Sequence, residues 1–351
     1  MNQVFYALPW YFEEISSRLS DKNWLVHSFK ENDDSEIYNP SNYLYNAEFD
    51  NTKYFLTLDL NIYQFLLNIV KKSEPKERFR DAAALLVFCQ ISNIEIDPTF
   101  SVYEKVNYDK CNLADALSDL ELFHNINNGD MEELAKYALG YSDSVLIKDL
   151  NNIDCEEVGN SLMKYEKLKE WDSLYLMVLS ITDINMNDSI PRNRKLDVFI
   201  DWVISEFRMS LVAIVYAIVL FGKRPIKRMM KYSKSHAIEK RRQSISNMTW
   251  DLYIMNQFFR RWTRKSENEE FLFASDDKAF GSLLRAAIEI QKTDNFEPIK
   301  SFLSPLEYSS AVRILEVDRT SESRAYNSEE WGSEYRARLI NKYESKLFTL
   351  S

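Results

Sequence analysis

The chain has 351 residues, of which 45% are hydrophobic and 14% aromatic, so it can form a sizeable core in one large domain or in two or three smaller ones. Its 6 glycines and 8 prolines disfavour long flexible linkers and all-β sandwiches, and they favour helices. The net charge of −10 disfavours a protein whose whole surface coats nucleic acid.

Several kinds of site and location are excluded by the residues present. Cys89, Cys111 and Cys155 are widely spaced, match no zinc pattern and suit a reducing compartment. The sequence has no GxSxG, Walker or GxGxxG motif. The first residues lack the basic and apolar regions of a signal peptide, and the apolar stretch 209–222 is shorter than a membrane span. We therefore expect a cytoplasmic protein without membrane contact, in which this stretch is a buried core helix.

The first third of the chain predicts an α/β arrangement. Residues 1–50 are rich in turn signals and predict an irregular extension with one short helix near 10–19. The elements expected after it are a strand over 54–60, a helix over 62–71, a helix over 80–92, a strand over 94–96 and a helical turn at 102–104. This β-α-β order indicates a parallel sheet.

The remaining two thirds are mainly helical in pattern. The candidate helices are 113–123, 130–140, 154–180 and 194–222. Residues 246–249 offer N-cap side chains for a helix to about residue 264, which precedes a strand over 271–275 and a helix over 278–291. Residues 312–317 are a candidate last strand, although 306–315 could also be helical, and 327–349 is helix-prone.

Two α/β pieces thus lie on either side of a helical block. The predicted organisation is an N-terminal extension over 1–50, a first core part over 51–110, a helical insertion over 111–243, a second core part over 244–318 and a helical tail over 319–351. We expect one α/β fold assembled from the two core parts.

Acidic residues follow the predicted strands and begin a predicted helix. Asp59 ends the first strand, Glu104 follows the second, Asp251 lies in a first helical turn, and Asp276 and Asp277 end the later strand. Ligands of an open parallel sheet bind beyond the carboxyl ends of its strands. Mg²⁺ and Mn²⁺ prefer carboxylate oxygens and can promote phosphodiester hydrolysis. The acids therefore predict a divalent-metal site.

Each acid also has a structural interpretation that stays open at this point. Asp59 could cap the helix that follows it, and Glu104 could be solvated on a helix surface. Asp251 could interact with the helix dipole, and Asp276 or Asp277 could cap the helix from Lys278.

The four acidic segments, taken in order, resemble the PIN domain, a metal-dependent nuclease fold. The matching segments are 55–61, 103–104, 250–251 and 272–278, which together with their elements cover about a third of the chain. The resemblance implies a three-layer α/β/α sandwich with a central parallel sheet, and endoribonuclease activity with Mg²⁺ or Mn²⁺, as in many bacterial toxins. It implies metal-binding and catalytic roles for Asp59, Glu104, Asp251 and Asp277, or Asp276 in place of the last, and an orienting role for Asn61.

A basic region interrupts this acidic chain. Arg224, Lys227, Arg228 and Lys231 have the spacing of one helical face, and Arg260 and Arg261 form a second cluster beside aromatic residues. Phosphate backbones attract such patches, and aromatic rings can stack on bases. The region predicts an RNA-binding rim, with a solvated helix or a docking face for an acidic partner as alternatives.

The sequence therefore predicts a metal-dependent endoribonuclease with RNA as its substrate, and family analogy suggests a bacterial toxin or defence effector with an antitoxin or other protein partner. Oligomerisation is left open. The alternatives are a non-catalytic PIN-like scaffold that binds a protein partner through its helical insertion, and a DNA-directed flap-type nuclease that would use the same acids.

Overall fold

The computed structural model describes residues 5–29, 36–108, 112–148, 157–160, 170–329 and 331–349. The chain divides into two compact units. Unit 1 comprises Met1–Glu166 and Arg260–Gly281, and unit 2 comprises Lys167–Phe259 and Ser282–Ser351. The predicted extension 1–50 belongs to unit 1, and the predicted limits at 243 and 318 both fall inside unit 2.

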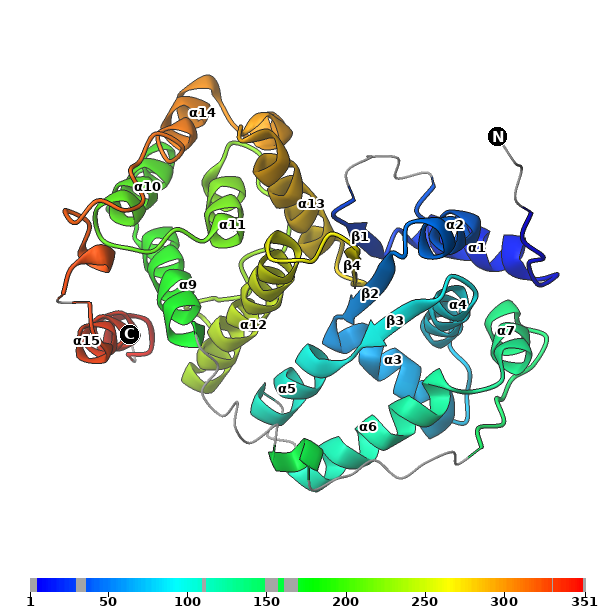
Figure 1. The fold of residues 1–351 in the computed structure, drawn as a ribbon. Helices are drawn as coiled ribbons and strands as arrows, with labels where there is room; N and C mark the ends of the chain where they lie inside the picture. The colour runs from blue at the N-terminus through cyan, green and yellow to red at the C-terminus, as the bar shows by residue number, and fades with distance from the viewer. Residues whose placement is uncertain are drawn as a thin grey trace. The chain divides into compact units, whose positions relative to one another are not determined.

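Unit 1 contains a small mixed sheet and the helices around it (Figure 1). Its elements are α1 (Phe12–Lys22), β1 (Leu25–His27), α2 (Pro40–Phe49), β2 (Lys53–Leu58), α3 (Leu60–Lys71), α4 (Glu77–Ile91), β3 (Ile94–Asp97), α5 (Thr99–Tyr108), α6 (Leu113–Asn127), α7 (Met131–Leu139) and β4 (Glu269–Ala274). The predicted strands and helices from residue 54 to residue 140 are therefore confirmed, apart from small shifts at their ends.

The strand order is β1-β4-β2-β3, and β2 is parallel to both of its neighbours. The predicted parallel sheet is thus confirmed for these three strands. β1 is antiparallel to β4, so the sheet as a whole is mixed. A three-residue strand is too short to show a period in the sequence, which is why β1 was missing from the prediction.

The two faces of the sheet follow the alternation of side chains along a strand. Leu56 and Leu58 of β2 and Leu272 of β4 point into one hydrophobic core, which also includes buried residues of α1, α3, α4, α6 and α7. On β4, Phe271 and Phe273 alternate with these positions, and Phe273 stacks on Phe280 with ring centroids 5.0 Å apart. Burial of large apolar side chains at about 1.5–3 kcal/mol each is the main stabilising contribution here.

The N-terminal segment belongs to this core, which corrects the prediction of an irregular extension. Ile15 and Leu19 of α1 and Leu25 of β1 are fully or almost fully buried in the same cluster as Leu56. α2 begins after Asn39, whose side chain accepts a hydrogen bond from the Ser41 backbone. These contacts join residues far apart in the chain, and local periodicity does not reveal them.

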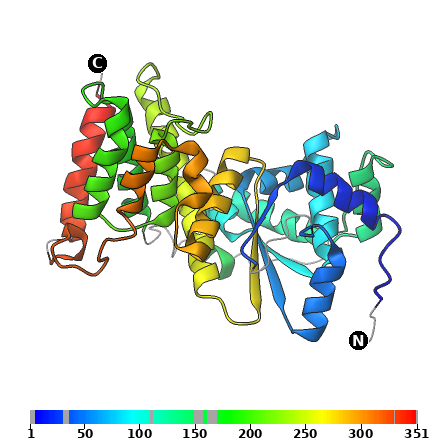
Figure 2. The same ribbon diagram turned by 90° about the horizontal axis from the view of Figure 1, so that it is seen from above.

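Unit 2 is helical in its described part. Its elements are α9 (Trp171–Met186), a 3₁₀ turn (Arg192–Arg194), α10 (Lys195–Ser205), α11 (Leu211–Phe221), a second 3₁₀ turn (Glu297–Phe302), α14 (Pro305–Val312), a third 3₁₀ turn (Ala325–Asn327) and α15 (Ser333–Leu347). α12 (Ile238–Thr263) and α13 (Lys278–Thr293) each contain a boundary between the units. α15 packs along α9, as Figure 2 shows.

Residues 312–317 form no strand, because Pro305–Val312 is a helix capped by Ser304 and Glu307.

The predicted helix over 194–222 is two helices, α10 and α11. The break is stabilised by Arg324, which is 4% exposed and donates hydrogen bonds to the carbonyls of Val203, Ile204 and Phe207. These carbonyls lie at and beyond the end of α10, where the helix no longer supplies regular partners, although the Val203 carbonyl also accepts from the backbone N–H groups of Glu206 and Phe207. The residue that satisfies them is about 120 positions away, so the local sequence gives no sign of the break.

Two further predicted helices differ from the structure in where they start. Much of the predicted helix 154–180 lies outside the described residues, and α9 starts at Trp171. α12 begins at Ile238 rather than near Ser246, because Arg241 and Ile245 are buried at helical spacing from Met248 and continue the buried face of the helix towards the N-terminus. The apolar stretch 209–222 forms the buried helix α11, as predicted. Within the described part of the chain, no helix combines the length and apolarity that a membrane crossing requires.

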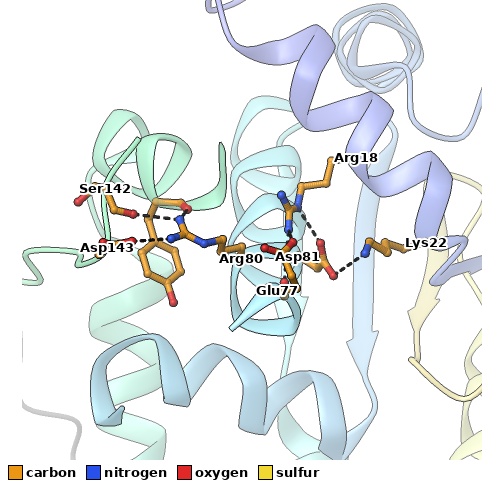
Figure 3. A network of polar contacts seen from close by, with 8 residues as sticks. Arg18, Lys22, Glu77, Arg80, Asp81, Ser142 and Asp143 are labelled. Carbon is orange, nitrogen blue, oxygen red and sulfur yellow. Dashed lines mark hydrogen bonds and ion pairs between the residues drawn. The ribbon is translucent and has the colours of Figure 1, made fainter. Parts of the chain in front are cut away.

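Buried charges join α1, α4 and the turn after α7 (Figure 3). Asp81 on α4 is 2% exposed, and its two oxygens pair with Arg18 at 2.7 Å and Lys22 at 3.0 Å. Arg80 donates to the Tyr137 and Ser142 carbonyls at 2.5 and 3.0 Å and pairs with Asp143. Buried charges of this kind fix the positions of helices, because a lost partner leaves an uncompensated charge.

Replacing Arg80 by alanine tests this network. We expect the free energy of unfolding to fall by about 2–4 kcal/mol, because the buried Tyr137 carbonyl and the part-buried Ser142 carbonyl each lose a charged donor and the packed methylene groups of Arg80 are removed. Arg78→Ala is the matched control on the same helix, where the side chain is 65% exposed, and it should cost less than about 1 kcal/mol. Urea unfolding followed by circular dichroism measures both values, and equal losses would contradict the assigned role of Arg80.

Candidate functional site

The carboxyl ends of β2, β3 and β4 lie at one edge of the sheet in unit 1. Thr57 of β2 is in register with Asp97 at the end of β3, and Leu58 is in register with Ala274 at the end of β4. The backbone N–H of Asp59 continues the ladder by donating to the Ala274 carbonyl at 2.9 Å. The residues that follow these strands therefore meet at this edge, where ligands of open parallel sheets bind.

Asp59 accepts a hydrogen bond from a residue that is far away in the sequence but adjacent in the sheet. The Ser275 hydroxyl donates to Asp59 Oδ2 at 2.8 Å, and the Asn61 side-chain amide approaches the same oxygen at 3.5 Å. Asp59 occupies the N-cap position of α3, but its side chain makes no capping hydrogen bond. The capping alternative for Asp59 is therefore not supported, and the predicted orienting role of Asn61 has a contact that agrees with it.

Glu104 lies near the middle of α5, which packs against β2. The Ser101 hydroxyl donates to the Leu58 carbonyl at 2.7 Å, and Glu104 is on the same helical face one turn later. Glu104 is 5% exposed, so the alternative of a solvated surface residue is wrong. Its position places a buried carboxylate on the side of α5 that faces the end of β2.

The orientation of α5 is fixed by a second charged cluster. Asp119 on α6 is 5% exposed and forms ion pairs with Lys71 of α3 and Lys105 of α5. Lys105 lies four residues after Ser101 on the same face of α5, so this ion pair and the hydrogen bond of Ser101 hold one side of the helix. Together these contacts restrict where the Glu104 side chain can lie.

The two acids after β4 have different surroundings. Asp276 accepts a hydrogen bond from the Trp24 indole at 3.1 Å through Oδ1 and pairs with Arg78 at 3.4 Å through Oδ2. Asp277 Oδ1 accepts from the backbone N–H groups of Ala279 and Phe280, so this residue caps α13 as one alternative expected. The hydrogen bonds that cap α13 use only Oδ1 of Asp277, whereas the contacts of Asp276 with Trp24 and Arg78 use both of its carboxylate oxygens.

Asp251 belongs to unit 2, unlike the other acids. It lies 13 residues after the start of α12, so its predicted place in a first helical turn is wrong. Its Oδ2 accepts a hydrogen bond from the Lys231 ammonium at 2.6 Å. Asp59, Glu104, Asp276 and Asp277 therefore all belong to unit 1, where Ser275 links Asp59 to the segment after β4, and Asp251 has a lysine as partner in unit 2.

A further pair at this edge was missed in the sequence. Asp97 ends β3 and forms an ion pair with Arg261, whose guanidinium also lies 4.8 Å from the centre of the Phe100 ring. Burial alone would raise the pKa of Asp97, but the charge of Arg261 and hydrogen bonds from Thr99 and Arg261 lower it below the usual value. Asp97 carried a signal in the sequence, since it ends a strand as Asp59 does.

The predicted basic residues fall into two groups. Lys231 and Arg261 form ion pairs with acids, and Arg260 is half-buried. Arg224, Lys227 and Arg228 are exposed, but the predicted helical face does not exist, because residues 222–237 form a loop. Pro225 explains the difference, since proline interrupts a helix.

The donor set at the edge suits a hard divalent cation completed by other ligands. Among the described residues, no three His, Cys, Asp or Glu side chains form a ready metal-binding group. Mg²⁺ is commonly bound by only one or two carboxylates, with waters and substrate phosphates as its other ligands. Asp59, held by Ser275, and the buried Glu104 are carboxylates that could serve such an ion, and Asp277 has one oxygen, Oδ2, that does not cap α13.

Comparison with protein-family models, with curated proteins and with solved structures finds no match to this chain.

The ion pair at the edge makes a pH-dependent prediction. The lowered pKa of Asp97 means that its ionised form stabilises the folded protein above the unfolded pKa of about 4, and that this contribution is lost as the pH falls through the folded pKa. Arg261→Gln should therefore lower the free energy of unfolding by about 1 kcal/mol near neutral pH and by less at about pH 3.

Arg264→Gln is the control, since Arg264 is exposed just beyond the end of α12. Urea unfolding at several pH values gives both differences. A cost of Arg261→Gln that stays constant from about pH 7 to pH 3 would show that its charge does not act on Asp97.

Proposed function

We propose that the protein is a PIN-like, metal-dependent endoribonuclease whose active site lies at the carboxyl edge of β2, β3 and β4. The observation that carries the proposal is the hydrogen bond from Ser275 to Asp59 at 2.8 Å. These two residues belong to the first and last segments of the resemblance and are 216 positions apart. Their contact supports the idea that both segments contribute to one site.

In the proposed site, Asp59, Glu104 and Asp277 hold Mg²⁺ or Mn²⁺. Asp277 is preferred over Asp276 because both oxygens of Asp276 contact Trp24 and Arg78. Asp251 is left out because its carboxylate pairs with Lys231 in the other unit. The metal, when bound, supplies a hydroxide from water and offsets charge on the phosphate oxygens.

The chain's own residues have distinct positioning roles in this proposal. Ser275 and Asn61 orient Asp59, as outer-shell hydrogen bonds do for metal ligands. Burial of Glu104 keeps water away from its carboxylate and strengthens its interaction with a cation. Asp97 keeps Arg261 at the edge, where a guanidinium can approach a phosphate oxygen.

The proposal also includes a three-layer fold and a biological role. A three-layer α/β/α arrangement is supported by the helices on one face of the sheet and by Phe280 of α13 stacked on Phe273 of the other. Action as a bacterial toxin or defence effector, with an antitoxin as partner, rests on the family resemblance.

A non-catalytic scaffold is the second candidate, because several of the acids already have structural partners. Asp277 caps α13, Asp276 contacts Trp24 and Arg78, and Asp251 pairs with Lys231. A scaffold would keep these contacts for stability and would bind neither metal nor RNA at the edge.

Substitutions at the edge separate the two candidates. We expect Ser275→Ala to lower Mn²⁺-dependent RNA cleavage about 10- to 100-fold, which is the usual effect of removing an outer-shell partner. Asp59→Asn should lower it by at least as much, because it removes a metal ligand. Asp50→Asn is the matched control, since Asp50 is exposed near the opposite end of β2 and should keep full activity.

Cleavage of a labelled single-stranded RNA, with folding checked by circular dichroism, gives the rates. Full activity of Asp59→Asn would place the nuclease site elsewhere. A wild-type protein that neither cleaves RNA nor binds Mn²⁺ would favour the scaffold.

A further inference from the structure

The loop 222–237 between α11 and α12 concentrates positive charge in an acidic protein. Lys223, Arg224, Lys227 and Arg228 occupy four of six consecutive positions, with no acid among them, and all four are exposed. The whole chain carries a net charge of −10, so this segment is a local reversal of sign. Such a reversal on an exposed segment indicates a ligand that is negatively charged.

The start of this loop is held in place by the segment around α14. The Arg224 backbone N–H donates to the Phe302 carbonyl at 3.1 Å, and the Lys223 N–H donates to Glu307 Oε2 at 3.2 Å. Gly222 approaches so closely that a Cβ there would lie 2.7 Å from the Phe302 oxygen. Only glycine fits at that contact. The backbone that leads into the basic residues is therefore fixed in position next to Phe302.

The backbone carbonyls in the rest of the loop, and the Tyr232 side chain, form hydrogen bonds with residues outside the loop. The buried Tyr216 hydroxyl donates to the Met229 carbonyl at 2.8 Å, and the Tyr232 hydroxyl donates to the Leu347 carbonyl at 2.6 Å. Arg241 is 7% exposed and donates to the carbonyls of Lys234 and His236 in the loop. The same guanidinium reaches the Leu347 and Thr349 carbonyls at the C-terminal end.

The cations of the loop therefore divide by position. Lys231 pairs with Asp251, and Lys234 contacts the Met186 carbonyl and Asp188. Among the described residues, the side chains of Lys223, Arg224, Lys227 and Arg228 enter no ion pair, and we call these four the basic tip. Glu307, which contacts the start of the basic tip, accepts hydrogen bonds from the backbone N–H groups of Lys223 and Ser304 through Oε2.

The backbone at the basic tip is also unusual. Arg228 has a φ of 68°, in the left-handed region that residues with a side chain rarely adopt. Such a conformation costs about 1–3 kcal/mol, and the next residue, Met229, is held by the hydrogen bond from Tyr216. The strain is consistent with a loop shaped to present Lys227 and Arg228 to a ligand.

We propose that the basic tip binds the phosphate backbone of single-stranded RNA. Arginine presents a planar fork of N–H donors that matches phosphate oxygens, and lysine adds a compact charge. A protein partner would need well-exposed apolar anchors, but Met229 and Tyr232 are both 4% exposed and Ile226 and Met230 are only partly exposed. The choice of RNA rests on the proposed nuclease function, whereas the preference for a phosphate backbone rests on the loop itself.

RNA binding without cleavage provides the test. Binding of a fluorescein-labelled single-stranded RNA to the full chain is measured by anisotropy in EDTA over a range of salt concentrations. Removing two phosphate contacts from a single strand should reduce the slope of log K against log salt by about 1.4. We therefore expect Lys227→Ala/Arg228→Ala to show this change and to bind roughly 10-fold more weakly at about 0.1 M salt.

Arg192→Ala/Arg319→Ala is the matched control, because it removes two exposed arginines from elsewhere in unit 2. It should keep the wild-type affinity and slope. If the two double variants had the same RNA affinity and the same salt slope, the proposal would be overturned. The basic tip would then contribute to RNA binding only through the net charge of the protein. Binding of a poly-glutamate peptide as tight as that of RNA of equal charge would also overturn it in favour of an acidic protein partner.

The two proposals can fail separately. If wild type does not cleave RNA with Mn²⁺ but binds it in EDTA, and Lys227→Ala/Arg228→Ala shows the reduced salt slope, the nuclease proposal fails and the basic tip stands. If wild type cleaves RNA and the Lys227→Ala/Arg228→Ala variant keeps the wild-type salt slope, the basic tip fails and the nuclease proposal stands.

Discussion

The parallel pairing of β2 with β4 is the constraint on which the arrangement of unit 1 depends. It joins segments more than 200 residues apart in the chain and sets their register from Lys53 with Glu269 to Leu58 with Ala274. Because side chains alternate along a strand, a slip by one residue would turn Leu56 and Leu272 out of the core. The same register brings Ser275 to Asp59 and the end of β3 to the same edge. Core packing and the candidate site are therefore set by one interaction.

Local patterns were sufficient to predict most of the elements around that pairing. β2, β3 and β4 are short apolar runs that end in acidic or small polar residues, and α3 and α4 show clear helical periodicity. Other features depend on distant partners. The break between α10 and α11 rests on Arg324, and the buried place of β1 rests on β4. The basic loop was mistaken for a helix although Pro225 was a local signal against it.

The candidate site shows the same division between local and distant information. The sequence indicated that Asp59 and Glu104 follow strands, but only the structure shows that Ser275 orients Asp59 and that Glu104 is buried. It could not separate Asp276 from Asp277, because the difference depends on Trp24 and Arg78. Arg261 was assigned to RNA binding from its charge, and its ion pair with Asp97, 164 positions away, gives it a second role at the edge.

The location of a bound metal ion tests the account most directly. A crystal of the full chain soaked in Mn²⁺, with anomalous scattering measured at the manganese absorption edge, would show where the ion binds. The account predicts a peak within coordination distance of the Asp59 carboxylate, with Glu104 or Asp277 as a further ligand and no such peak in Asp59→Asn crystals. A wild-type crystal with the edge of β2, β3 and β4 empty, or with Mn²⁺ bound only elsewhere, would contradict it.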